Sequence, residues 1–252
     1  VVAALERLRA GGHQAYLVGG TVRDVLMGRP DSLPVDVATD RLPGEVTALF
    51  PRVEPIGIEH GTVLVLLDRV SLECTTFRRE GAYRDARHPD AVSFTPDLGA
   101  DLARRDFTVN ALAFDPLSGA LADPSGGLAD LEVRRLRAVG EPLARFREDA
   151  LRPLRAARFA ATLGLEPEAA TRAALGGARD RARLVAMERV REELVRLMGA
   201  PRPSVGLELL REAGLLELWL PELARCWAVP QNRWHAHDVY THSIRSMAKR
   251  PG

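Results

Sequence analysis

Two acidic residues, Asp36 and Glu73, interrupt apolar runs that have the character of β-strands. A carboxylate inside an apolar strand is costly to bury unless it is paired or bound to a metal ion. If the two strands lie side by side, both carboxylates converge on one edge and can hold a divalent cation against phosphate oxygens. For Glu73 taken alone, the alternative is a solvent-facing residue on an edge strand.

The segment from Leu17 to Asp24 provides a place for a phosphate group. An apolar run ends at Gly19 and Gly20, and a helical pattern that carries Arg23 follows. Glycine lets the backbone approach a phosphate closely, and the first N–H groups of a helix are free to bind an anion. Paired glycines also occur in ordinary turns, but with the carboxylate of a neighbouring strand they suggest nucleoside triphosphate chemistry.

A second group of polar residues lies in segment 104–112. Arg105 is the second of two adjacent arginines and is followed by Asp106 and Asn110. Arginine forks can clamp triphosphate oxygens, and Asp106 can orient an arginine or cap the helix predicted to follow, with Asn110 one turn further on. The alternative is an ordinary charged start of a helix.

A third group repeats polar residues at a helical interval. Asp149, Arg152, Arg155 and Arg158 recur every three residues, which makes them neighbours along one helix. Such a pattern usually forms a solvated, salt-bridged face, but the apolar residues between them indicate a mostly packed helix. Asp149 can accept from an exocyclic amino group while Arg152 donates to the adjacent ring nitrogen, a pair that selects cytosine and adenine over uracil and guanine.

The elements around these residues predict an α+β head, with a mixed β-sheet and helices, followed by an all-helical region. Short segments rich in β-branched or apolar residues predict strands at 15–18, 35–38, 62–67 and 71–77. Helical spacing predicts helices at 21–27, 44–50, 148–163, 166–175, 186–198 and 204–213. The arginine-rich segment from Arg78 to Asp90 is predicted as a loop, and no strand is predicted after Gly140.

The predicted organisation is a catalytic head at 1–138, a helical neck at 139–200 that reads the base, and the start of a truncated helical body at 201–252. A net charge of +1 gives no bulk electrostatic argument for nucleic acid binding. No membrane span or signal segment is recognisable, and two distant cysteines favour reduced thiols, so we expect a cytoplasmic protein. No obligate protein partner is evident.

The motifs together resemble those of class II tRNA nucleotidyltransferases and bacterial poly(A) polymerases, the CCA-adding enzyme family. The matching segments, in order, are 19–24, 104–111, 148–152 and 188–193. The resemblance covers nearly the whole chain. It implies template-independent addition of C and A, from CTP and ATP, to the 3′ end of tRNA, with Mg²⁺ held by Asp36 and Glu73 as catalytic residues. The implied nucleotide-binding residues are Gly19, Gly20, Arg23, Arg105, Asp106, Asn110, Asp149, Arg152, Arg155 and Arg158.

The resemblance breaks at Pro34. The family's catalytic pattern is two aspartates flanking one residue, which together hold two magnesium ions, and Pro34 stands where the first belongs. Asp31 is the only nearby replacement and would need a loop rearrangement. Three interpretations stay open: an inactive nucleotide- or RNA-binding homologue, a deliberate variant, or a site reorganised around Asp31, Asp36 and Glu73.

Two further alternatives concern the substrate and the reaction. The motifs do not separate CCA addition from poly(A) addition to other RNAs, although the residues Arg84, Asp85 and Arg87 of the predicted loop are of the kind that helps the pocket switch from C to A. A metal-dependent phosphohydrolase built on His235, His237 and Asp238 is the other rival. Such a site lacks downstream ligands, so helix-capping and packing roles are favoured there.

Overall fold

The computed structural model describes residues 1–30, 33–80 and 92–247, which separate into two compact units. The first unit ends at Val133 and the second begins at Arg134, a few residues before the predicted end of the head at 138. None of the helices in these ranges combines the length and the apolar character that a membrane crossing requires.

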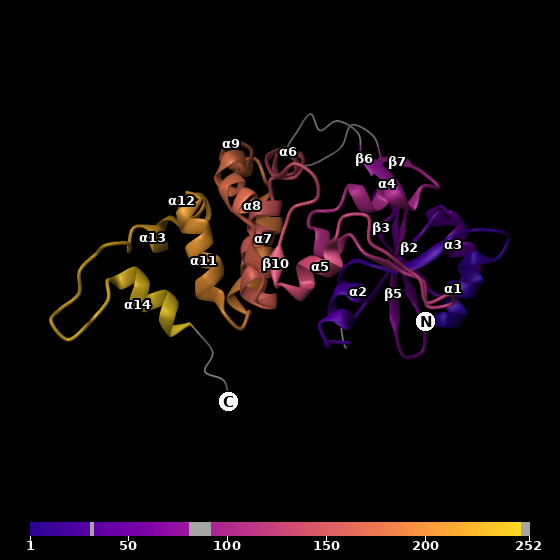
Figure 1. The fold of residues 1–252 in the computed structure, drawn as a ribbon, viewed down its shortest axis with the longest axis horizontal. Coiled ribbons are helices and arrows are strands. Elements are labelled where there is room, and N and C mark those ends of the chain that lie inside the picture. Colours follow the sequence, from indigo (N-terminus) through magenta and orange to yellow (C-terminus); the bar gives the residue numbers. More distant parts are fainter. Residues whose placement is uncertain (31–32, 81–91, 248–252) are drawn as a thin grey trace. The chain divides into compact units, whose positions relative to one another are not determined.

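The first unit is built on a mixed sheet with helices beside it (Figure 1). Among the described residues this sheet has seven strands, in the order β3-β4-β5-β2-β1-β8-β9. Its central pair, β2 and β5, is parallel, and the other pairs are antiparallel. The four predicted strands are confirmed to within one residue at each end, whereas the other three are too short or too polar for a clear pattern. The strands are β1 (Ala15–Val18), β2 (Val35–Thr39), β3 (Val53–Gly57), β4 (Thr62–Leu66), β5 (Ser71–Thr76), β8 (Ala113–Phe114) and β9 (Leu121–Ala122).

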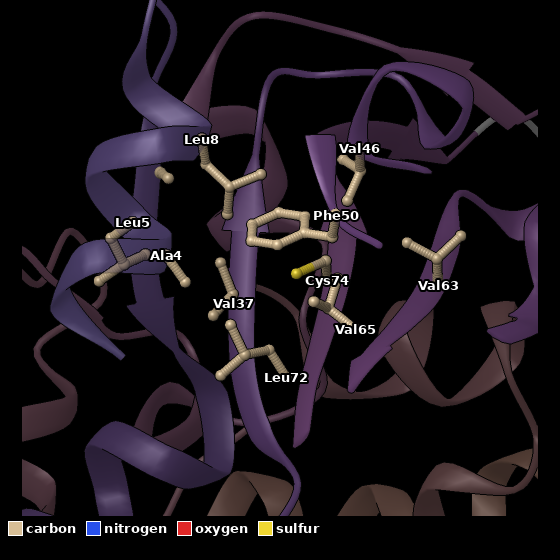
Figure 2. Packing of buried hydrophobic residues seen from close by; sticks show 11 residues of the cluster. Ala4, Leu5, Leu8, Val37, Val46, Phe50, Val63, Val65, Leu72 and Cys74 are labelled. Carbon is tan, nitrogen blue, oxygen red and sulfur yellow. The ribbon is translucent and has the colours of Figure 1, made fainter. Parts of the chain in front are cut away.

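Helices cover the two faces of this sheet unequally. On one face, α1 (Val2–Arg9) and α3 (Pro43–Leu49) pack on β1, β2, β4 and β5 around a core that Figure 2 shows. On the other face, Leu102 of α4 (Leu98–Ala103) packs with Phe77 and Ala38. Because side chains alternate along a strand, this core fixes which residues of β2 and β5 point away from α1 and α3.

Shorter elements complete the first unit. They are α2 (Gly19–Leu26), α5 (Gly127–Glu132), the 3₁₀ turns η1 (Ile58–His60) and η2 (Thr108–Asn110), and the paired strands β6 (Arg78–Glu80) and β7 (Val92–Phe94). The prediction of a loop from Arg78 to Asp90 is therefore wrong at its start, where Arg78 pairs with Phe94 in a strand. The rest of that segment, with Arg84, Asp85 and Arg87, lies outside the described residues.

The second unit is mainly helical. The described helices are α6 (Pro142–Glu148), α7 (Arg152–Leu163), α8 (Ala169–Ala174), η3 (Leu175–Ala178), α9 (Arg179–Ala182), α10 (Met187–Met198), α11 (Pro203–Glu212), α12 (Leu216–Trp219), α13 (Pro221–Ala224) and α14 (Val239–Ser246). The expectation that no strand follows Gly140 is wrong, because β11 (Glu166–Pro167) pairs in parallel with β10 (Arg135–Leu136). Two residues give no periodic signal, so such a short strand leaves no pattern in the sequence.

The predicted helix at 148–163 is confirmed from Arg152 to Leu163 but is wrong at its start, because the chain leaves the helical conformation at Asp149. Asp149 is extended, with φ −130° and ψ 105°, and its Oδ1 accepts a hydrogen bond from the Leu151 amide at 3.1 Å. Pro153 explains the break: it has no N–H to donate to the carbonyl of Asp149, and proline is tolerated only in the first helical turn. Arg152, Arg155 and Arg158 share α7, but Asp149 precedes it.

Helices α7 and α11 cross closely at Gly206. A Cβ atom at Gly206 would lie 2.6 Å from the carbonyl oxygen of Ala157 and 2.9 Å from the Cδ1 of Leu197. Only a residue without a side chain fits this crossing, since neighbouring backbone cannot give way as a flexible side chain can.

We expect Gly206→Ala to lower the free energy of unfolding by about 1–3 kcal/mol, because overpacking forces α7 and α11 apart. Urea denaturation followed by circular dichroism measures this change. Gly199→Ala is the matched control in the same unit, since its Cβ would lie 3.4 Å from the nearest atom with φ at −77°. Equal stability of the two variants would contradict the close crossing.

Candidate functional site

The acidic residues Asp36 and Glu73 lie next to each other in the sheet. They are register partners on the parallel strands β2 and β5. Val37, Leu72 and Cys74 pack in the core beneath α1 and α3, so the two acids between them point to the opposite face. The prediction that these two strands are neighbours and bring the carboxylates together is confirmed.

Asp36 also binds the start of α2. Its Oδ2 accepts a hydrogen bond from the Thr21 amide at 3.2 Å, and its own amide donates to Thr21 Oγ1 at 2.7 Å. The glycine turn permits this approach, because a Cβ at Gly20 would lie 3.1 Å from Oδ2 and Gly19 has a φ of +59°. The helix start thus binds a negative group, the Asp36 carboxylate, through the Thr21 amide.

Both carboxylates have a raised pKa. Burial raises the pKa of Asp36, and hydrogen bonds from Thr21 and the positive charge of Arg105 oppose the rise. Burial and the negative charge of Asp36 raise the pKa of Glu73. Two half-buried like charges on adjacent strands are stabilised by a cation between them, and carboxylate oxygens suit a hard divalent ion.

Arg23 is held by a chain of buried polar groups. Its Nε and Nη2 donate to both carboxylate oxygens of Asp24, and its Nη1 donates to Asn110 Oδ1 at 2.6 Å. Asn110 in turn donates to Asp106 Oδ1, which also accepts from the Phe107 amide. The structure therefore brings together three predicted site residues from segments more than 80 positions apart.

Segment 104–112 does not form the regular helix that its spacing suggests. Only the 3₁₀ turn η2 forms there, and Asp106 orients Asn110 rather than capping an α-helix. Arg105 lies beside the glycine turn, since a Cβ at Gly19 would be 2.8 Å from its Nη1. Its Nη2 donates to Asp101, a buried residue of α4 that the sequence reasoning did not identify. The only available signal was an acidic residue four positions before an arginine.

In the second unit, the two predicted base readers each have an ionic partner. Asp149 Oδ2 accepts from Arg189 Nη2 of α10 at 3.0 Å. Arg152 is 5% exposed, and its Nη1 donates to Glu148 Oε2 at 2.8 Å and to the carbonyl of Arg145 at 2.9 Å. Both side chains are therefore fixed before any ligand binds.

Arg155 and Arg158 converge on one acid of α10. Glu193 is 3% exposed and forms ion pairs with both, and the Arg158 guanidinium lies 4.0 Å from the centre of the Phe159 ring. The alternative of a solvated, salt-bridged face is therefore wrong for this part of α7. A buried acid between arginines leaves their other donors in a fixed direction.

The C-terminal histidine-rich segment has structural roles. Asp238 caps α14, where its Oδ1 accepts from the Thr241 amide and its Oδ2 from the Ala228 amide. His237 Nε2 is bonded to Arg245. Among the described residues, no three His, Cys, Asp or Glu side chains are grouped as metal ligands, so the capping role is favoured over a phosphohydrolase centre.

Comparisons with known proteins agree with this geometry. Residues 15–137 match the "Poly A polymerase head domain" family, and residues 164–226 match "Probable RNA and SrmB- binding site of polymerase A". The CCA-adding enzyme of Anoxybacillus flavithermus is 44% identical over 88% of this chain and 55% of its own length, and that of Streptococcus gordonii is 48% identical over 87% and 54%. The crystal structure of the Bacillus stearothermophilus CCA-adding enzyme in complex with CTP has a TM-score of 0.82 and 38% identity over 90% of this chain and 55% of that chain.

The chain belongs to the family of CCA-adding enzymes and bacterial poly(A) polymerases. It spans about half the length of the curated relatives it matches. The fold expected from the resemblance, a nucleotidyltransferase head followed by a helical region, is confirmed.

Membership in this family makes Pro34 the main departure at the site. Pro34 directly precedes β2 and carries no side-chain donor, and Asp31 lies outside the described residues. Asp36 and Glu73 fit one divalent ion, since they supply carboxylate oxygens from adjacent strands. Within the described part of the chain, a third acidic ligand for a second ion is not grouped with them.

We expect Glu73→Gln to stabilise the protein at pH 8. The folded state binds the Glu73 proton more tightly than the unfolded state, whose pKa is 4.5, so this group destabilises the fold as the pH rises above that value. The amide carries no charge, and the difference from wild type should vanish below pH 4.5. Chemical denaturation at pH 8 and pH 4 measures it.

Glu54→Gln is the control, because Glu54 is exposed on strand β3 of the same sheet. That variant should match wild type at both pH values. A stabilisation by Glu73→Gln that grows as the pH falls would contradict the proposed burial of charge.

Proposed function

We propose that this chain is the nucleotidyltransferase portion of an enzyme that adds C and A to the 3′ end of tRNA, from CTP and ATP, releasing pyrophosphate. The register pairing of Asp36 and Glu73, directly beside the glycine turn of α2, is the observation that carries the proposal. A related tRNA nucleotidyltransferase, 29% identical with a TM-score of 0.71, was solved with a primer tRNA and an incoming ATP analogue.

In the proposed reaction, the first unit acts on the triphosphate. The guanidinium groups of Arg23 and Arg105 bind phosphate oxygens beside the glycine turn, whose Thr21 amide is held by Asp36. The 3′ hydroxyl of the RNA attacks the α-phosphorus and loses its proton. The new O–P bond forms as the bond to pyrophosphate breaks, and the arginines stabilise the charge on the leaving group.

Asp36 and Glu73 would hold Mg²⁺, which neutralises phosphate charge when it is bound. These residues also keep the cation on the sheet face that carries the glycine turn, because the core beneath α1 and α3 fixes their direction. A bound cation would offset the repulsion between the two acids, which contributes to the raised pKa of Glu73.

The second unit supplies base selection in this proposal. Asp149 accepts from the amino group of cytosine or adenine, and Arg152 donates to the neighbouring ring nitrogen. Uracil and guanine present a carbonyl oxygen to the carboxylate, which leaves unpaired polar groups and a larger penalty. Arg155 and Arg158, fixed by Glu193, complete the proposed nucleotide contacts.

Poly(A) addition to other RNAs and a silent nucleotide-binding homologue are the competing functions. The second is favoured by Pro34. Extension assays with Mg²⁺ and labelled CTP or ATP separate them, using tRNA that ends before CCA, before the terminal A, or after complete CCA. Extension confined to incomplete tRNA ends supports CCA addition, whereas repeated A addition to unrelated RNA supports poly(A) synthesis. Nucleotide binding without extension identifies the silent homologue.

We expect Pro34→Asp to raise the extension rate by about a hundredfold or more, because a third carboxylate at the metal site stabilises the transition state by several kcal/mol. Single-turnover extension of tRNA lacking CCA measures the rate. Pro34→Ser is the control, since it also removes the proline but adds no carboxylate. If both variants, Pro34→Asp and Pro34→Ser, extend tRNA at the wild-type rate, the metal assignment at Asp36 and Glu73 is wrong.

We expect Asp149→Asn to reduce the preference for CTP over UTP by about tenfold or more, because an amide donor replaces the acceptor that faces the base. The amide oxygen can still accept from the Leu151 amide, so the change is milder for folding than alanine. Glu212→Gln, which removes an exposed ion pair with Arg172 in the same unit, is the control. An equal loss for all four nucleotides would make Asp149 a structural residue.

A further inference from the structure

Arg105 is held at the glycine turn by very few groups. Its side chain is 17% exposed, yet its buried Nε makes no hydrogen bond among the described residues. Its Nη1 donates to the carbonyl oxygen of Asn110 at 3.3 Å, and its Nη2 to Asp101 Oδ2 at 3.1 Å. Without Asp101, only the longer of these two bonds would fix the guanidinium.

Asp101 is an unusual acid because it is completely buried. It lies on α4 with 0% of its surface exposed. Its Oδ1 accepts from Arg104 Nε at 2.9 Å, from Arg104 Nη2 at 2.7 Å and from the Arg78 amide at 3.3 Å, so only Oδ2 serves Arg105. Burial alone would raise the pKa of Asp101, but the charges of Arg104 and Arg105 hold it below its usual range.

The two guanidinium groups that share the Asp101 carboxylate are held differently. Arg104 directs two of its donors to Asp101, whereas Arg105 uses one and extends its Nη1 toward the glycine turn. A guanidinium fixed by one carboxylate loses less freedom when it binds a phosphate than a free one does.

We propose that Asp101 is a positioning residue for triphosphate binding: it directs Arg105 to the glycine turn, where Arg105 contacts phosphate oxygens. This inference rests on the proposed function, since it assumes that Arg105 binds the triphosphate. Asp101 itself touches no substrate, because it is buried beneath the two arginines. Its effect is on phosphate affinity and is independent of the base.

The test measures the dissociation constants of CTP, UTP and inorganic tripolyphosphate by calorimetry with the whole chain. Asp101→Asn should weaken all three by about tenfold, as expected for loss of a charge-assisted hydrogen bond, while the ratio of CTP to UTP stays constant. In the Arg105→Gln background, Asp101→Asn should add less than about a twofold effect, because the two residues act as a unit. Independent, additive losses would overturn the proposal.

Asp97→Ala is the matched structural control. Asp97 caps the same helix, where its Oδ1 accepts from the Gly99 amide, so removal of this carboxylate destabilises α4. That variant should melt at a lower temperature and bind CTP as wild type does. If Asp97→Ala weakens CTP binding as much as Asp101→Asn does, the effect comes from helix stability and the proposal is wrong.

A second variant covers the case in which Asp101→Asn does not fold. The double variant Asp101→Asn/Arg104→Gln removes one charge of each sign and still leaves Arg105 without its carboxylate. Compared with Arg104→Gln alone, it should bind tripolyphosphate about tenfold more weakly, and equal binding would overturn the proposal. A wild-type chain that binds neither CTP nor tripolyphosphate would overturn the proposed function itself, whereas normal wild-type binding with unchanged variants overturns only the role of Asp101.

Discussion

The placement of two acids side by side on β2 and β5 is the constraint on which the site depends. Asp36 and Glu73 repel each other and are partly removed from water, so their pairing costs free energy in the empty protein. The apolar side of the same strands offsets this cost: Val37 and Leu72 pack in the core formed with α1 and α3. A shift of the strand register by one residue would turn the two acids into that core. The apolar residues on one face of the sheet therefore fix the acids on the other face.

In both units, the arginines of the candidate site are each paired with a carboxylate. Arg23 is held by Asp24, Arg105 by Asp101, Arg152 by Glu148 and Arg158 by Glu193. In each pair a carboxylate fixes the fork before a ligand arrives, so part of the ordering entropy is lost on folding and not on binding. Because these cations are locally neutralised, the net charge of +1 is compatible with a phosphate-binding protein.

The sequence is most informative where a residue's surroundings are local. The strands around Asp36 and Glu73 could be predicted because apolar runs broken by one acid have few other interpretations, and the glycine turn follows from backbone freedom. The start of the helix near Asp149 is predicted wrongly because the three-residue periodicity continues through it. A single residue, Pro153, is the only signal in the sequence that the helix must begin after Asp149. The ionic partner of Asp149, a predicted base-reading residue, could not be inferred from the sequence. Arg189 is 40 positions away in the chain, and only folding brings the two side chains together.

Pro34 shows that the fold and the chemistry of β2 are separable. Proline has no N–H to donate, so it is tolerated at the first residue of a strand or before it, but not within a central one. The pairing of β2 with β5 begins at Val35, opposite Leu72, and the Asp36 amide is occupied by Thr21 Oγ1. The sheet therefore keeps its register with proline at position 34, and what this residue removes from the family's pattern is a carboxylate and not a structural bond. The placement of Asp36 does not depend on the residue that precedes the strand, so the remaining pair of acids is a property of the sheet itself.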